Sequence, residues 1–161
     1  MKLFPTKYYS IELQNDSSIA MTNLKSNTLS AEQFVTDWKK QTFIGKIHND
    51  EFEIKLSKNF YGTFCVLNGK LEKRNGTLQI RVDKTLKILF WIVVLFVMSG
   101  LIASLIRNRL DNLLPLIMTI IVFRFIFIEL VFRIISKTGL DKLTKIIGIT
   151  KLEKNEVQQF V

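Results

Sequence analysis

Three charged side chains interrupt the most apolar stretch of this sequence. Residues 116–135 read LIMTIIVFRFIFIELVFRII, with Arg124, Glu129 and Arg133 inside the run. A carboxylate near arginines in an apolar segment can belong to a proton or ion path, face a partner helix, or meet a lipid headgroup. Glu129 and Arg133 are four residues apart with the acid first, the favourable order for a helical ion pair. Arg124 lies about 140° around an α-helix from Glu129, so this second pair is poorly aligned.

Other residue types that carry chemistry give weaker patterns. The segment HNDEFE, residues 48–53, holds a histidine and three acids, but Asn and Asp are ordinary turn residues and predict a hairpin turn here. Cys65 is the only cysteine, which excludes an intrachain disulfide and a thiol-rich metal site. Neither a phosphate-binding glycine loop nor a zinc spacing is present. We therefore expect a protein that is not an enzyme, with no catalytic residue, metal or cofactor.

The charged run is the second of two apolar segments. The first, Ile88 to Ile106, has no charged residue, and as a helix it would be about 28 Å long, which matches the hydrocarbon core of a bilayer. Trp91 lies near its start, at the depth where an amphipathic ring suits the headgroups. The polar turn RNRLDN, residues 107–112, separates it from the second segment, residues 113–135. The sequence predicts a transmembrane helical hairpin over residues 87–135.

The second segment tolerates its charges. Its aliphatic and aromatic residues favour insertion by about 5–10 kcal/mol. A central Arg124 opposes insertion by about 3 kcal/mol, and Glu129 by less because it lies further out. Two alternatives remain open: Arg124 is a functional residue inside the membrane, or the helix is shifted so that Arg124, Glu129 and Arg133 lie in the cytoplasmic interface.

Basic residues predict the orientation of the hairpin. Lys and Arg are frequent on both outer flanks of the pair of segments and scarce in the turn between them, so both termini should be cytoplasmic. No continuous apolar run of a signal peptide occurs near the N-terminus, and we expect a multi-pass protein of the cell inner membrane. The net charge of +9 alone does not indicate nucleic-acid binding. Candidates for contact with lipid headgroups are Lys84, Lys87, Lys137, Lys142 and Lys145.

Small residues in the first segment predict close helix packing. Two pairs with a spacing of four are present, Ser99 with Ala103 and Gly100 with Ser104. Packing against the second segment of the same chain is the first interpretation, and homodimerisation is the second.

Before the hairpin, apolar and polar residues alternate with the period of a half-buried strand. Strands are expected at residues 8–13 and then as a meander over residues 42–83, with Asn75-Gly76 as the strongest hairpin signal. Asp16 can cap one short helix, and Ser30 with Gln33 fits the capping box of another. The first strand is expected to add to an edge of this meander, which gives a small antiparallel sheet.

After the hairpin, Gly139 is the expected helix stop. Residues 139–154 then place Leu140, Leu143, Ile146 and Ile147 on one stripe, as in a basic amphipathic helix. The stripe can lie on the inner leaflet or pack on the sheet, and the sequence leaves both open.

The run FIGKIHNDEFEI…GTFCVLNGKLEKRNGTLQIRV, followed by paired apolar segments, resembles small uncharacterised bacterial two-span membrane proteins. In these a β-rich cytosolic module of the pleckstrin-homology-like sort accompanies a two-helix hairpin. The resemblance covers about residues 42–135. It implies this arrangement of modules, but no activity and no functional residue.

Together these patterns predict an α+β membrane protein. A small N-terminal antiparallel β-sheet with one or two short helices (1–86) precedes the transmembrane helical hairpin (87–135, spans about 88–106 and 113–135) and a basic amphipathic C-terminal tail (136–161). We expect a non-enzymatic interaction module that binds a protein partner or a second copy of itself beside the lipid bilayer. The alternatives are an oligomeric transport or channel subunit using Arg124 and Glu129, and a module that binds anionic lipid.

The predicted orientation can be tested with reporter fusions. A reporter fused after Val161 should be active in the cytoplasm, because the basic flanks favour that side. A reporter inserted in the turn at residues 107–112 should be active only outside the membrane. Activity of the Val161 fusion in the periplasm alone would show that the orientation is reversed.

Overall fold

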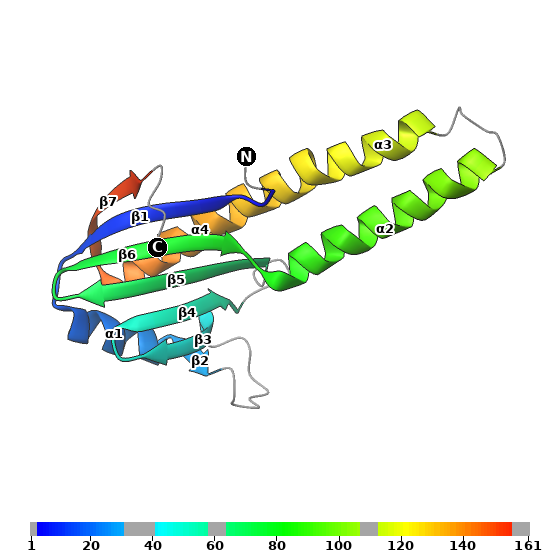
Figure 1. Ribbon diagram of the computed structural model, residues 1–161. Coiled ribbons are helices and arrows are strands. Elements are labelled where there is room, and N and C mark those ends of the chain that lie inside the picture. Colours follow the sequence, from blue (N-terminus) through cyan, green and yellow to red (C-terminus); the bar gives the residue numbers. More distant parts are fainter. Residues whose placement is uncertain (1–2, 31–40, 58–63, 107–112, 156–161) are drawn as a thin grey trace.

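A seven-stranded sheet and two long apolar helices make up most of the structure (Figure 1). This computed structural model describes residues 3–30, 41–57, 64–106 and 113–155. The strands are β1 (Thr6–Leu13), β2 (Thr28–Ser30), β3 (Phe43–His48), β4 (Glu51–Leu56), β5 (Cys65–Glu72), β6 (Asn75–Val82) and β7 (Ile149–Asn155). The helices are α1 (Ser17–Ser26), α2 (Lys84–Ile106), α3 (Leu113–Val122) and α4 (Glu129–Ile147), and a π-helical segment, η3 (Phe123–Ile128), joins α3 to α4.

The expected meander is present. The strands lie in the order β2-β3-β4-β5-β6-β1-β7, and every neighbouring pair is antiparallel except β2 with β3. In β1 the alternation predicted from the sequence is visible, since Tyr9, Ile11 and Leu13 are buried. Asn49 adopts a left-handed conformation, with φ of 43°, at the turn between β3 and β4. As expected, the first strand adds to an edge of the meander by pairing with β6, and β7 then pairs with its other side.

The second hairpin is present but its turn lies elsewhere than expected. Glu72 pairs with Asn75 across the end of the hairpin, so Lys73 and Arg74 form the turn, and Lys73 has φ of 53°. Gly76 belongs to β6, where a Cβ would lie 2.7 Å from the carbonyl oxygen of Lys70. The glycine is therefore explained by close approach of two strands rather than by turn geometry.

The two short-helix signals have different outcomes. Asp16 precedes α1, and its carboxylate accepts a hydrogen bond from the backbone N–H of Ser17. Ala20, Met21 and Leu24 form the buried side of this helix. The capping box predicted at Ser30 and Gln33 extends into residues 31–40, which lie outside the described residues.

Helix α4 and β7 differ from the expected C-terminal segment. Gly139 does not stop the helix; a Cβ there would lie 3.2 Å from Leu67 Cδ1, so the glycine lets the helix approach the sheet. The helix ends at Gly148, whose φ of 72° and N–H bond to Thr144 form a left-handed cap. Leu143 and Ile147 are buried in the core, so the apolar stripe packs on the sheet. After Gly148 the chain forms β7, a strand of the same sheet, rather than the expected tail.

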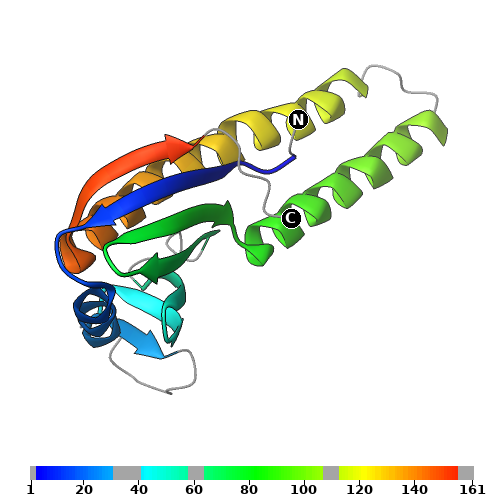
Figure 2. The ribbon, with the colours of Figure 1, turned by 60° about the vertical axis from the view of Figure 1, so that its left-hand side comes forward.

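The sheet has one covered face and one open face. Figures 1 and 2 show α4 running along one face of the sheet, with α1 beside it, while no described helix lies over the other face. The covered face carries the core, which combines apolar side chains of the sheet with those of α1 and α4. Among its fully buried members are Leu24, Ile54, Leu67, Leu78, Ile80 and Leu143.

Helices α2 and α3 form the predicted hairpin and extend away from the sheet (Figure 1). Two helices, Lys84–Ile106 and Leu114–Ile147, are long and apolar enough to cross a membrane. Only 17 % and 6 % of their most apolar windows are buried within the protein. Large apolar side chains are exposed along both, including Phe96 at 78 % and Ile106 at 80 %.

Substitution of Gly139 should separate α4 from the sheet. Gly139→Leu inserts a side chain where the Leu67 methyl groups lie, and overpacking of a core costs about 1–3 kcal/mol. We expect a lower unfolding midpoint in detergent. Thr138→Leu changes an exposed neighbour on the same turn and should have a much smaller effect. Equal midpoints for the two variants would contradict the assigned packing of α4.

Candidate functional site

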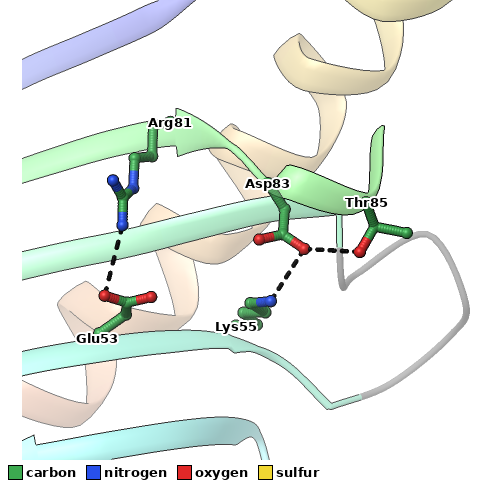
Figure 3. Close-up of polar contacts among 5 residues, drawn as sticks. All are labelled: Glu53, Lys55, Arg81, Asp83 and Thr85. Carbon is green, nitrogen blue, oxygen red and sulfur yellow. Dashed lines mark hydrogen bonds and ion pairs between the residues drawn. The ribbon is translucent and has the colours of Figure 1, made fainter. Parts of the chain in front are cut away.

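Asp83 joins the sheet to the hairpin. It lies between β6 and α2, and its backbone carbonyl accepts a helical hydrogen bond from the N–H of Lys87. Its carboxylate oxygen Oδ2 accepts from Thr85 Oγ1 at 3.0 Å and is 2.9 Å from Lys55 Nζ (Figure 3). Asp83 therefore acts as the N-cap of α2 and as one half of an ion pair with β4.

The charge on Asp83 is stabilised in spite of its burial. Burial alone would raise the pKa of Asp83, but hydrogen bonds from the Lys55 ammonium, the Lys84 backbone N–H and the Thr85 hydroxyl together bring its pKa below the ordinary value. Beside this group, Arg81 Nη2 lies 3.4 Å from Glu53 Oε2 across the open face (Figure 3). Both pairs join β4 to the end of β6, so they hold the base of the hairpin against the sheet.

Aromatic rings on three segments align the base of the hairpin. The rings of Phe90 and Phe123 stack with centroids 6.4 Å apart, and Phe4 meets Phe90 edge-on at 5.6 Å. Phe127 stacks on Phe123 at 4.9 Å. Because Phe90 is three residues after Lys87, this cluster lies about 5 Å along α2 from that lysine.

The alignment determines the level of Arg124, which comes directly after Phe123. Arg124 is half-buried, its Nη1 has no hydrogen-bond partner among the described residues, and its guanidinium lies 5.5 Å from the Phe125 ring. The three charged residues that the sequence singled out do not form one cluster of ion pairs. Within the described chain, neither Glu129 nor Arg133 has a salt bridge, so the expected pair between them is not formed. The α-helical angle assumed for Arg124 and Glu129 also fails, because residues 123–128 are π-helical.

The small residues of α2 divide into two sides. Ser104 is buried, and a Cβ at Gly100 would lie 3.4 Å from Leu116 Cδ2, so this pair faces α3 as the first interpretation expected. Ser99 and Ala103 are exposed on the hairpin. The structure thus assigns one pair to packing within the chain.

The five candidate lysines do not lie at one level. Lys84 and Lys87 are at the start of α2, where Lys87 Nζ is 5.5 Å from the Phe4 ring centroid. Lys137 lies further along α4, and Lys142 and Lys145 are about 30 Å of helix rise beyond Arg124. Contact of this set with lipid headgroups stays a prediction, and the geometry favours it only at the base of the hairpin.

Lys7 is a residue of this region that no sequence signal indicated. It lies in β1, and its Nζ donates to Ser136 Oγ at 2.8 Å and lies 5.2 Å from the Phe132 ring centroid, both on α4. Burial lowers the pKa of Lys7, and the nearby charges of Lys154 and Arg133 lower it further. Lys7 therefore ties β1 to the start of α4, which only the packing of distant segments reveals.

A second region is a polar row across the open face. Cross-strand partners run from β7 to β3 in an unbroken series: Asn155, Tyr8, Gln79, Asn68, Glu53 and Lys46. Gln79 Nε2 donates to Tyr8 Oη at 3.1 Å. Asn68 Oδ1 is enclosed without a hydrogen-bond partner among the described residues. The polar positions of the strand alternation were the available sequence signal, but their partners depend on strand order.

This row lines a hollow of about 350 Å³ on the open face. His48, Glu51 and Lys70 lie at its far side. Cys65 is on the covered face, fully buried, and burial raises its pKa to about 12, so it cannot meet His48 or act as a thiolate near neutral pH. Among the described residues, no group of three or more His, Cys, Asp or Glu side chains is arranged to hold a metal ion.

Removal of the Asp83 carboxylate should loosen the base of the hairpin. Asp83→Ala loses the cap and the Lys55 pair, and we expect about 1–3 kcal/mol of destabilisation at neutral pH. Because the folded pKa of Asp83 is depressed, this contribution is present above the unfolded value of 3.8 and is lost as the pH falls through the folded pKa. The difference between wild type and variant should therefore shrink below about pH 4.

Unfolding midpoints in detergent across pH, with hydrogen exchange over residues 83–90, provide the measurement. Glu153→Ala removes an exposed pair with Lys151 and should change neither quantity. A pH-independent loss in Asp83→Ala would show that the carboxylate charge has no part in stabilising the junction.

No family model, no curated protein and no solved structure matches the chain.

Proposed function

We propose that this chain is a non-enzymatic integral protein of the bacterial inner membrane. The hairpin formed by α2 and the continuous helix that begins with α3 would cross the bilayer, with both termini in the cytoplasm and the sheet beside the membrane. The observation that carries this proposal is the exposure of large apolar side chains along two helices, whose most apolar windows are only 17 % and 6 % buried within the protein. In water such a surface would be a strong aggregation site, whereas lipid satisfies it.

The role proposed for the sheet is to bind a protein partner through its open face. That face carries a hollow of about 350 Å³ lined in part by the polar row, and the unpartnered Asn68 oxygen within it can accept a hydrogen bond from a bound segment. The opposite face is occupied by α4 and the core, so it is unavailable. The short connection at Asp83 would keep the binding face within a fixed distance of the membrane.

The alternative of an oligomeric transport subunit has less support. Arg124 lies level with Phe90, near the sheet end of the hairpin, rather than at mid-depth. Glu129 lies further still toward the sheet. These positions suit the interfacial interpretation of the charges better than an ion path across the bilayer.

In-cell photo-crosslinking tests the open face. A photoreactive residue at Asn68 or Gln79 should give a discrete adduct, because both positions line the hollow. The same residue at Asn23, exposed on α1, is the matched control and should give none. Addition of Glu53→Lys, a charge reversal at the rim, should reduce the adduct.

An adduct of twice the chain mass would identify the partner as a second copy. Equal adducts from all three positions, or none from Asn68 and Gln79, would contradict binding at this face.

A further inference from the structure

Arg124 carries an uncompensated positive charge within an apolar surface. A guanidinium is always ionised and has five N–H donors. Nη1 is enclosed without an acceptor among the described residues, and that part of the chain supplies Arg124 with no carboxylate. The guanidinium carbon lies 5.5 Å from the centroid of the Phe125 ring. Enclosing part of a guanidinium away from water is costly unless a hydrogen-bond acceptor or an anion accompanies it.

The described acidic groups at the junction of the sheet and the hairpin do not provide that anion. Asp83 is engaged by Lys55, and Glu53 by Arg81. Glu129, the next acid along the helix, makes no ion pair within the described structure. Among the described residues no carboxylate therefore neutralises Arg124, and a bound anion can supply the counter-charge.

The surroundings of Arg124 indicate where that charge comes from. Phe125 and Ile126 are more than half exposed on the same turn, and Trp91 is 53 % exposed on the turn of α2 that carries Phe90. The Phe90–Phe123 stack places Arg124 within about one turn of the level of Lys87. Apolar side chains on one side of that level and lysines on the other are the signature of the headgroup region.

We propose that Arg124 binds the phosphate of an anionic phospholipid in the inner leaflet. The planar guanidinium can donate two parallel hydrogen bonds to phosphate oxygens, and the acyl chains would lie along the exposed apolar side chains of the hairpin. This inference rests on the proposed membrane insertion and adds a specific lipid contact to it. Binding of a lipid phosphate would also give Arg124, the charged residue inside the apolar run, a role at the membrane–cytoplasm interface.

Native mass spectrometry of the full chain released from detergent tests the proposal. Phosphatidylglycerol, which is anionic, is titrated against phosphatidylcholine, which is zwitterionic. Wild type should retain phosphatidylglycerol preferentially, and Arg124→Leu should weaken that retention about tenfold, as expected for loss of a charge-assisted pair. Arg124→Lys keeps the positive charge but lacks the paired N–H donors of the guanidinium. Its retention of phosphatidylglycerol should lie between those of wild type and Arg124→Leu.

The matched control is Arg133→Leu, an exposed arginine on the same continuous helix. It should leave the preference for phosphatidylglycerol unchanged. A loss equal to that of Arg124→Leu would show that basic charge in general causes the retention, and would overturn the proposal. Unchanged retention by Arg124→Leu would overturn it too. Glycerol phosphate should not compete, and if it does the site binds a soluble phosphate rather than a lipid. If Arg124→Leu and Glu129→Leu both abolish a dimer and leave lipid retention intact, the counter-charge is a second copy's carboxylate.

Two further measurements keep the outcomes separate. Arg124→Leu removes a charge from an apolar helix, and an unchanged unfolding midpoint confirms that the variant is folded. Should it fail to fold, Arg124→Lys still separates the contribution of the guanidinium's paired N–H donors from that of the positive charge. Extraction of membranes with alkaline carbonate tests insertion independently. Release of the wild-type chain would reject the membrane hairpin itself, whereas retention with no lipid preference rejects the Arg124 site alone.

Discussion

One continuous helix, from Leu113 to Ile147, is exposed along its first part and packed against the sheet along its second part. The rest of the structure depends on this packing. Along α3 the side chains are apolar and exposed, whereas along α4 one side is buried against the sheet. The transition falls near η3, where Ile128 is the first fully buried side chain of the helix. Burial of α4 supplies the second layer that a half-apolar sheet requires. Without this packing the sheet would expose its covered face.

Close contact at Gly139 makes that burial possible. The helix backbone lies near Leu67 and Leu56 because no Cβ intervenes. The core residues Leu143 and Ile147 come next on the same side, and Gly148 then reverses the chain so that β7 can pair with β1. The segments before and after the hairpin thereby form a single sheet. The hairpin is an insertion between two strands of that sheet.

The same contacts fix the position of the hairpin relative to the sheet. Two covalent connections enter it, one at Asp83 and one through η3, and aromatic stacking between Phe90 and Phe123 joins them. Lys7 adds a contact between β1 and α4. A partner bound on the open face would therefore be held near the base of the hairpin, because few rotatable links lie between them. The proposed position of the sheet beside the membrane depends on this short linkage.

Local chemistry was sufficient for much of the secondary structure. Period-two alternation indicated β1 and the meander, Asp16 indicated α1, and the uncharged run before residue 107 indicated α2. These features depend on neighbours in sequence, so pattern alone finds them. The predictions at Asn75-Gly76 and Gly139 were wrong because the sequence does not distinguish a glycine required for close approach of two segments from one required for a turn or a helix cap.

Only the tertiary structure decided which partners distant in sequence meet. The pairing of β7 with β1, the polar row from Asn155 to Lys46 and the contact of Lys7 with Ser136 all join segments whose register no local pattern encodes. The sequence by itself determined that Arg124 is a charge within an apolar run. Its level beside Phe90, and its lack of a partner in the described chain, result from how two antiparallel helices align, which is set by ring packing between them.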